Sequence, residues 1–468
     1  MAPPPPRPER KRPTIPVERL TVGMFVAELD RPWLGTPFAL EGMLVVRESQ
    51  ILELRRLCRF VRIDLDKSSA EVQHTFRGAM QDAPGKKPGM LSGLFGRLRG
   101  MIGGAPDDPR EARAEAVDEV PLEVTAARLH LPDGIQLRKY ADPIPLEQAR
   151  PKAERAVNRS AEALDTVMSD LRDNVAPDFG KIGESAGALV ESMIENPDAM
   201  MLVSEMRKGH QGAYERALKA TLNLLALGRH LGFPRQELQT LATIGMLADI
   251  GKTQLPEALL DKPGRLTPAE FKVVSTHVEL GLSVLRKGFA LSPAMEQGIR
   301  EHHERMDGSG YPRGLKGEQI SIYGRMAAVA DCFAALISDR PYAKALAPLD
   351  AIMELYRLAG SKLHEPLVEQ LVQAIGAFPV GTMVELSNGE IAVVLTRNKA
   401  RRMEPRVLVL AGPDKQALET PFERDLATDT PEAADRPPWI WRGLADGAYG
   451  IDLHGYYAGD DVQRNANP

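Results

Sequence analysis

A long helical pattern, running from about residue 145 to about residue 375, constrains the fold more than any other feature of the sequence. In PLEQARPKAERAVNRSAEALDTVMSDLRD, apolar residues recur every three and four positions, which is the spacing of one face of an α-helix. ALKATLNLLALGRHLG and LQTLATIGML are apolar almost all round, as is typical of helices enclosed by other helices. The sequence therefore predicts a mainly α protein with a helical bundle at its centre.

Short apolar runs before and after the bundle predict two small parts that contain strands. Before it, VERLTVGMFVAEL, FALEGMLVV and FVRIDLD are typical of strands, and SQILELRRLC is typical of a helix, which together indicate a small α/β module. After it, TMVEL and IAVVL flank Asn388-Gly389, a strong signal for a hairpin turn, and RVLVL follows. We expect a short β extension there.

The other segments have no sustained period, and the two ends of the chain and the segment before the bundle are rich in Pro, Gly or charge. The predicted parts are a disordered Pro-rich tail (1–16), the small N-terminal α/β module (17–75), a flexible linker (76–120), a connecting helical segment (121–200), the central helical domain (201–375), the β extension (376–412) and a C-terminal tail (413–468).

Composition narrows the classes of function. The net charge of −5 predicts no broad cationic surface for a nucleic-acid polymer. Two cysteines, Cys58 and Cys332, are too few for a disulfide framework and fit a reducing compartment. No apolar run reaches the roughly 18 residues of a membrane span, and no signal peptide is recognisable. We expect a cytoplasmic protein without a transmembrane segment.

Residues of the kinds that bind metals recur through the bundle. Asp249, His277, the pair His302-His303 and Asp331 each lie in or beside a helix that is expected to be buried. A buried His or Asp is costly unless it is hydrogen-bonded or coordinated, and a lone one is more often a satisfied core residue than a ligand. Adjacent helical side chains point about 100° apart. Both histidines can therefore reach one site only if a metal pair or a broad pocket lies at the helix end.

The segment after the histidines predicts a tight loop beside that pocket. Residues 307–312, Asp-Gly-Ser-Gly-Tyr-Pro, cannot continue a helix, because the glycines allow positive φ and the proline restricts the chain. The alternatives for Tyr311 are packing on a nucleotide base and packing on the protein itself.

The motifs ADIGK, HVELG, HHERMDGSGYP and DCFAALISDRPY, in this order and spacing, resemble the HD-GYP domain of the HD superfamily of metal phosphohydrolases over roughly residues 205–375. VERLTVGMFVAELDRPWLGTPF resembles a module of unknown function that often precedes such domains, and FPVGTMVELSNGE resembles a β extension that often follows them. The resemblance implies an HD-type helical bundle. It also implies a bacterial phosphodiesterase that hydrolyses cyclic di-GMP with two or three iron or manganese ions.

The resemblance also implies which residues form the site. The implied metal ligands are Asp249, His277, His302, His303 and Asp331; the implied catalytic residues are Asp249 and Lys252; and the implied substrate-binding residues are Lys252, Tyr311 and Arg340. Arg340 matches a position of the family that contacts the phosphate of cyclic di-GMP.

The chain departs from the family pattern around one of the metals. Arg216 stands at the position of the first histidine, Ala248 at that of the His-Asp histidine, Ala334 at that of a second aspartate, and Gly212 at that of a glutamate ligand of three-metal members. Two lost imidazoles lower the affinity for the first metal by at least roughly 10⁴-fold. We therefore expect one divalent transition metal, iron or manganese.

Arg216 is expected to fill the vacated place, because a guanidinium suits carboxylates such as Asp249 and Asp331. The alternative is that Arg216 turns to solvent and that these carboxylates hydrogen-bond elsewhere.

The function that we expect is that of a receptor or interaction module in cyclic di-GMP signalling, with a degraded metal site and weak or no hydrolysis. The alternatives are an active metal-dependent cyclic di-GMP phosphodiesterase and a protein-binding scaffold. The expected partners are cyclic di-GMP, a signalling protein and a second copy of the chain in a homodimer.

Overall fold

The computed structural model divides into two compact units, Met1–Val120 and Pro121–Pro468, which are described separately. The residues that it describes are 14–29, 42–45, 48–63, 68, 129, 131–132, 134–206, 213–339, 344–398, 404–429, 438–444 and 447–451. The predicted linker 76–120 lies outside these residues, as do the first 13 residues of the predicted Pro-rich tail.

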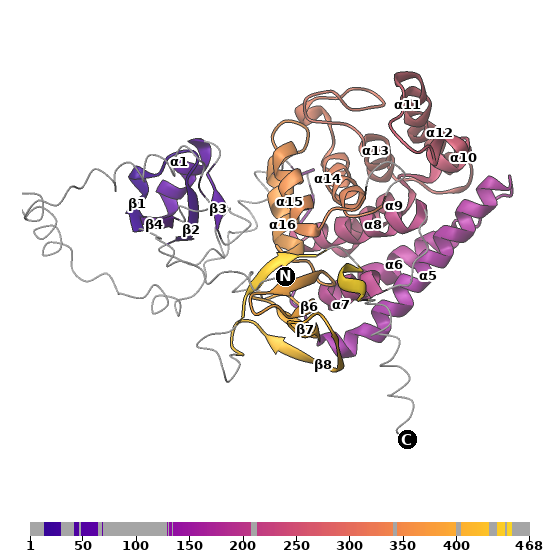
Figure 1. The fold of residues 1–468 in the computed structure, drawn as a ribbon. Coiled ribbons are helices and arrows are strands. Elements are labelled where there is room, and N and C mark those ends of the chain that lie inside the picture. Colours follow the sequence, from indigo (N-terminus) through magenta and orange to yellow (C-terminus); the bar gives the residue numbers. More distant parts are fainter. Residues whose placement is uncertain are drawn as a thin grey trace, which may run out of the picture. The chain divides into compact units, whose positions relative to one another are not determined.

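The described residues of the first unit form a small antiparallel sheet with one α-helix (Figure 1). Along the chain, its elements are β1 (Thr14–Pro16), η1 (Val17–Arg19), β2 (Phe25–Leu29), β3 (Met43–Leu44), α1 (Glu48–Leu57) and β4 (Phe60–Ile63). In the sheet, the strands lie in the order β1-β4-β2-β3. Val26, Leu54 and Ile63 are fully buried in its core. Residues 14–16, which were predicted to belong to the tail, form the strand β1. Pro16 is tolerated there because β1 is an edge strand.

The second unit is mainly helical, which confirms the predicted fold class (Figure 1). Its helices are α5 (Leu146–Arg172), α6 (Gly180–Glu195), α7 (Pro197–Met206), α8 (Ala213–His230), α9 (Arg235–Leu247), η4 (Ile250–Gln254), α10 (Glu257–Leu260), α11 (Pro268–Ser275), α12 (His277–Gly288), α13 (Pro293–Glu301), η5 (Gly317–Gln319), α14 (Ile322–Leu336), α15 (Pro348–Leu358), α16 (Glu365–Ile375) and η6 (Ala448–Gly450). None of the described helices is long and apolar enough to cross a membrane.

Helix α8 lies at the centre of this bundle. It packs against α9, α14 and α16, and its Leu222, Leu225 and Leu227 are almost completely buried. Leu238 and Leu241 of α9 are buried in the same way. The two stretches that are apolar all round are therefore enclosed helices, as their pattern predicted.

Helices α5, α6 and α7 belong to the same packed body. α6 packs against α9, and α5 packs against α6, α7 and α8. Val157 and Leu164 of α5 and Leu189 and Met193 of α6 have no exposed surface. The segment that was expected to connect two domains is therefore part of the wall of the bundle.

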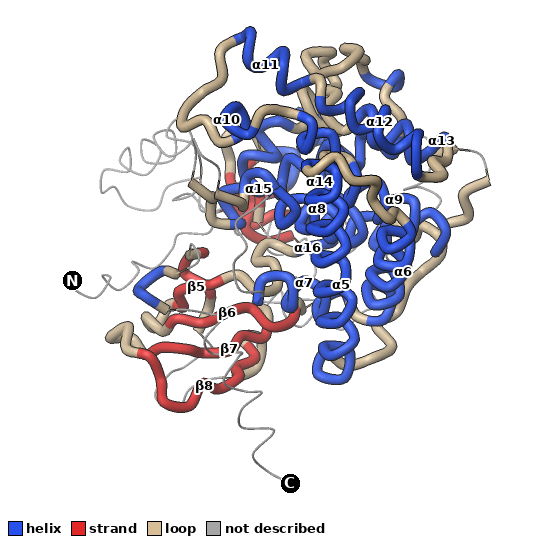
Figure 2. The backbone as a smooth tube through the Cα atoms, turned by 90° about the vertical axis from the view of Figure 1, so that its right-hand side faces the viewer, coloured by secondary structure: helices blue, strands red, loops and turns tan. Residues whose placement is uncertain are grey.

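The C-terminal sheet is antiparallel, in the strand order β8-β7-β6-β5-β9. Figure 2 shows β5 to β8 side by side. The strands are β5 (Met383–Leu386), β6 (Ile391–Thr396), β7 (Arg406–Ala411), β8 (Ala417–Asp425) and β9 (Ile440–Gly443). Gly389, with a φ of 89°, turns the hairpin between β5 and β6, and its N–H donates to the Leu386 carbonyl oxygen at 2.9 Å. This confirms the predicted hairpin.

The sheet extends beyond residue 412, so the prediction that the chain is a tail from residue 413 needs correction. β8 and β9 form the two edges of the sheet. β8, with the sequence ALETPFERD, is mostly exposed and polar, so it carries no alternating apolar pattern. An edge strand of this kind is recognisable only from its pairing with β7.

Candidate metal centre

Asp249 is placed by a close backbone contact between two segments. It stands between α9 and η4, and η4 packs against the first turn of α12, which begins at His277. A Cβ atom on Gly251 would lie 1.9 Å from the carbonyl oxygen of His277 and 2.4 Å from the backbone nitrogen of Gly281. Only glycine at position 251 lets the two backbones approach in this way, which brings Asp249 beside His277.

The adjacent histidines occupy the end of α13, where they can share a site. Ser292 caps the start of the helix by accepting from the backbone nitrogen of Met295 at 3.2 Å. His302 is the C-cap residue and His303 follows it in the turn. The centroids of their rings lie 4.0 Å apart. Both histidines therefore face one place from the helix end.

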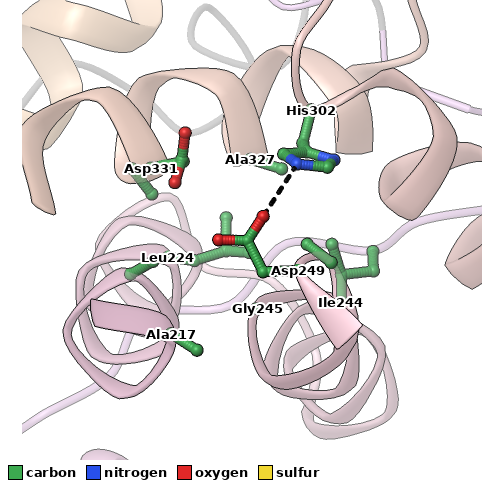
Figure 3. A pocket seen from close by; sticks show the side chains of 11 residues that line it. Ala217, Leu224, Ile244, Gly245, Asp249, His302, Ala327 and Asp331 are labelled. Atoms are coloured by element: carbon green, nitrogen blue, oxygen red, sulfur yellow. Dashed lines mark ion pairs between the residues drawn. The ribbon is translucent and has the colours of Figure 1, made fainter. Parts of the chain in front are cut away.

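Four of the five predicted ligands come together. Asp249, His277, His302 and His303 each offer a ligand atom, and these atoms all lie within 4.8 Å of one another. The fifth, Asp331 on α14, is outside this group, and its Oδ2 lies 3.8 Å from His303 Nδ1. Figure 3 shows Asp249 with His302 on one side of it and Asp331 on the other.

Unsatisfied buried atoms show that this group fits a cation. His277 Nδ1 lies 2.8 Å from the carbonyl oxygen of Val274, and His302 Nδ1 lies 2.7 Å from that of Ile299. A carbonyl oxygen only accepts, so each Nδ1 carries the proton and each Nε2 presents a lone pair. These Nε2 atoms face Asp249 Oδ1 at 3.4 and 3.6 Å.

None of these three facing atoms has a hydrogen-bond partner among the described residues. Burial lowers the pKa of His277 and holds that of His303 well below its usual value. Both rings are therefore neutral at pH 7, as metal binding requires. Histidines that donate their other N–H to a backbone carbonyl are typical metal ligands.

The second oxygen of Asp249 is bound by cationic side chains. Its Oδ2 accepts from Lys252 Nζ at 2.6 Å and from Arg216 Nη2 at 3.4 Å. Burial raises the pKa of Asp249, but the cationic side chains of Lys252 and Arg216 act in the opposite direction, and that pKa is held well below its usual value. The predicted contact between Arg216 and Asp249 is therefore present, and Lys252 contacts the same carboxylate.

A small pocket beside Asp249 shows what replaces the histidine of the usual motif. Ala248 lines it. Asp249, His302 and Asp331 line it too (Figure 3). Its other lining residues are Ala217, Ala220, Leu224, Ile244, Gly245, Ala327 and Ala330. On this side the site offers two carboxylates and a wall of mostly small apolar side chains.

Two glutamates that were not singled out from the sequence hold the histidine turn and the loop after it. Glu304 accepts from the backbone nitrogens of Arg313 at 2.7 Å and Leu315 at 3.0 Å. Glu301 accepts from Arg313 Nη2 at 2.8 Å and from the backbone nitrogen of Ser321 at 2.7 Å. Both are at most 2% exposed. The available signal was their position on either side of the histidine pair, within a segment that is expected to be buried.

The predicted tight loop is confirmed. Gly308 has a φ of 81°, and a Cβ atom on Gly310 would lie 2.4 Å from the backbone nitrogen of Arg305. The Tyr311 N–H donates to the carbonyl oxygen of His303 at 3.2 Å, and the two rings lie 4.7 Å apart. Tyr311 therefore packs on a ligand of the cluster. Arg340, the other predicted substrate-binding residue, lies outside the described residues.

Two family models match parts of this chain. The model of the HD domain matches residues 199–366, and that of a domain of unknown function (DUF3391) matches residues 13–182. The second match covers the small sheet, all of α5 and the start of α6.

Curated relatives share sequence with different parts of the chain. A cyclic di-GMP phosphodiesterase, PA4108, of Pseudomonas aeruginosa is 29% identical over 396 residues, which are 84% of each chain. A cyclic di-GMP phosphodiesterase of Thermotoga maritima is 45% identical over 125 residues, 26% of this chain and 33% of that protein. The 3'3'-cGAMP-specific phosphodiesterase 3 of Vibrio cholerae is 40% identical over 133 residues, 27% of this chain and 28% of that protein.

Proposed function

We propose that this chain binds cyclic di-GMP as a signalling receptor. The chain belongs to the HD-GYP family of HD domain proteins and carries an N-terminal module ahead of that domain. Its site holds one metal ion, and it hydrolyses the dinucleotide weakly or not at all. The relatives named as cyclic di-GMP phosphodiesterases support the choice of ligand.

The observation that carries this proposal is that the two oxygens of Asp249 have different neighbours. Oδ1 faces the unpartnered Nε2 atoms of His277 and His302, while Oδ2 is taken by Lys252 and Arg216. One side of the carboxylate is thus open to a metal, and the other is already neutralised by cationic side chains. This supports a site with one ion.

The four clustered residues would hold a divalent transition metal, iron or manganese, which when bound polarises a phosphate oxygen. Hydrolysis of a phosphodiester by this kind of site typically uses two metals ~3.5–4 Å apart, which stabilise both the attacking and the leaving oxygen. Arg216 is a fixed cation that can attract a phosphate but cannot activate water. The arrangement therefore favours binding over turnover.

Two other functions remain as alternatives. An active phosphodiesterase is favoured by the complete four-residue cluster and by the likeness to PA4108 over 84% of the chain. A protein-binding scaffold would use neither the metal nor the nucleotide. A protein partner, a homodimer and a cytoplasmic location stay predictions from the sequence.

We expect the purified protein to retain at most one tightly bound transition-metal ion per chain, because Asp249 and three histidines converge on one place while Arg216 and Ala248 supply no imidazole for a second ion. Elemental analysis after loading with manganese or iron and desalting measures this number. The variant His302→Ala should retain almost none. Two or more ions in the unmodified protein would overturn the one-metal site.

The same sample decides between the three functions. Calorimetry with cyclic di-GMP and chromatography of the products measure binding and hydrolysis separately. Binding without turnover supports a receptor, and turnover at a rate of about 1 per second or more supports an active enzyme. A protein that neither binds nor hydrolyses the dinucleotide is the scaffold.

A further inference from the structure

An exposed aromatic side chain stands beside the metal cluster. Phe271 of α11 is 50% exposed, and its ring lies 5.6 Å from that of Tyr311, at an interplanar angle of 89°. The centroid of the Tyr311 ring in turn lies 4.7 Å from that of the His303 ring. A continuous series of rings therefore runs from the protein surface to a ligand of the cluster.

The helix that carries Phe271 is firmly held, although it is short. Thr267 Oγ1 accepts from the backbone nitrogen of Glu270 at 3.3 Å, and Glu270 Oε2 accepts from the backbone nitrogen of Thr267 at 2.7 Å. Lys262 Nζ donates to both oxygens of Glu270 at 2.7 and 2.8 Å. These bonds, with that of Lys262 the strongest, lower the pKa of Glu270 to about 2. Phe271 follows directly on this anchored residue.

A fixed aromatic ring with half its surface uncovered is suited to stacking. Every nucleotide base has a π-face, and stacking on an aromatic side chain holds a base without reading its identity. The cluster and the cationic side chains at Asp249 suit the phosphates of a nucleotide, but these charges do not distinguish a nucleotide from any other phosphate. An exposed aromatic ring beside the cluster can make that distinction, because it contacts a base and not a phosphate.

We propose that Phe271 is a specificity-determining residue that stacks on one purine base of the cyclic dinucleotide, while a phosphate of that dinucleotide lies at the cluster. Tyr311 joins the two subsites, because its ring contacts both Phe271 and His303. This inference rests on the proposed function. It adds that the site selects for phosphodiesters with bases and tolerates different purines.

Replacement of Phe271 with alanine tests the stacking contact in the full-length, metal-loaded protein. Since stacking on an aromatic side chain is lost, the Kd for cyclic di-GMP should rise about tenfold. Phe271→Trp should keep the affinity of the parent, and Phe271→Leu, which is apolar but has no ring, should be as weak as Phe271→Ala. Affinity for inorganic phosphate should be the same in all four proteins.

Val273 provides a matched control, because it lies on the same helix and is 45% exposed. Val273→Ala should leave the Kd for cyclic di-GMP unchanged. Unchanged affinity in Phe271→Ala, full affinity in Phe271→Leu or an equal loss in Val273→Ala would each overturn the stacking role. A parent protein that binds no cyclic dinucleotide would instead overturn the proposed function, and the stacking role with it.

Discussion

Replacing Arg216 and Ala248 together with histidine is expected to raise the metal content from one to two ions per chain and to produce clear hydrolysis of cyclic di-GMP. The two imidazoles would join Asp249, which Arg216 now contacts, and Asp331 as the four ligands of the second ion. Regaining two ligands should raise the affinity for the second ion by at least roughly 10⁴-fold.

The pocket beside Asp249 is the structural basis of this expectation. Ala248 lines it together with both carboxylates, and many of its other lining residues are alanine or glycine. Such a wall can accommodate an imidazole without displacing a large side chain. The removal of Arg216 also removes the permanent positive charge that opposes a second cation.

The two changes should depend on each other, as substitutions that share one site do. Arg216→His alone supplies three of the four ligands, and Ala248→His alone keeps the guanidinium beside Asp249. Elemental analysis and a hydrolysis assay of both single variants, the double variant and the parent measure this dependence. A double variant that folds yet binds no more metal than the parent would mean that α8 and α9 no longer direct these positions to one point.

Gly251→Ala is expected to destabilise the protein strongly and to disrupt the metal cluster. The new Cβ would meet the carbonyl oxygen of His277 at 1.9 Å and the backbone nitrogen of Gly281 at 2.4 Å. No flexible side chain can move aside there, so η4 and α12 must separate and Asp249 must move away from His277. We expect a loss of about 3 kcal/mol or more in the free energy of unfolding.

Gly187→Ala in α6 is the matched control, because a Cβ atom there meets nothing within 4 Å. That substitution should stabilise the protein by about 0.5–1 kcal/mol, since alanine is the better helix former. Urea unfolding of both variants, with and without added manganese, measures the two effects. A Gly251→Ala protein with the stability and metal content of the parent would contradict the backbone contact described here.

Much of the fold could be predicted because burial leaves a period in the sequence. α8 and α9 are enclosed, and their all-apolar pattern showed it; Asn388-Gly389 turns the predicted hairpin. β8 and β9 were missed, since an exposed edge strand has little burial to record. The extent of the bundle was underestimated because α5 and α6 carry a clear period that does not say what covers their apolar faces.

The candidate site divides in the same way. Histidine and aspartate in a buried pattern indicated five candidate ligands, because such residues are costly inside a protein unless they are bound, and four of the five form the cluster. The sequence could not show that Asp331 lies beside His303 but outside the group of four, which depends on how α13 and α14 pack. It also could not show that Lys252 turns to Asp249, because a lysine beside a turn is usually a solvated surface charge.

Because α5 and α6 pack against α8 and α9, the folding unit of this chain is larger than the part that matches the HD domain. The HD domain match begins at residue 199, so the sequence family is defined by the later helices alone. The hydrophobic core extends beyond that boundary, because four residues of α5 and α6 are fully buried in the core: Val157, Leu164, Leu189 and Met193. A fragment that starts at residue 199 would expose the apolar surface that these side chains cover. The smallest piece of this chain that folds cooperatively therefore includes helices that the HD domain match leaves out.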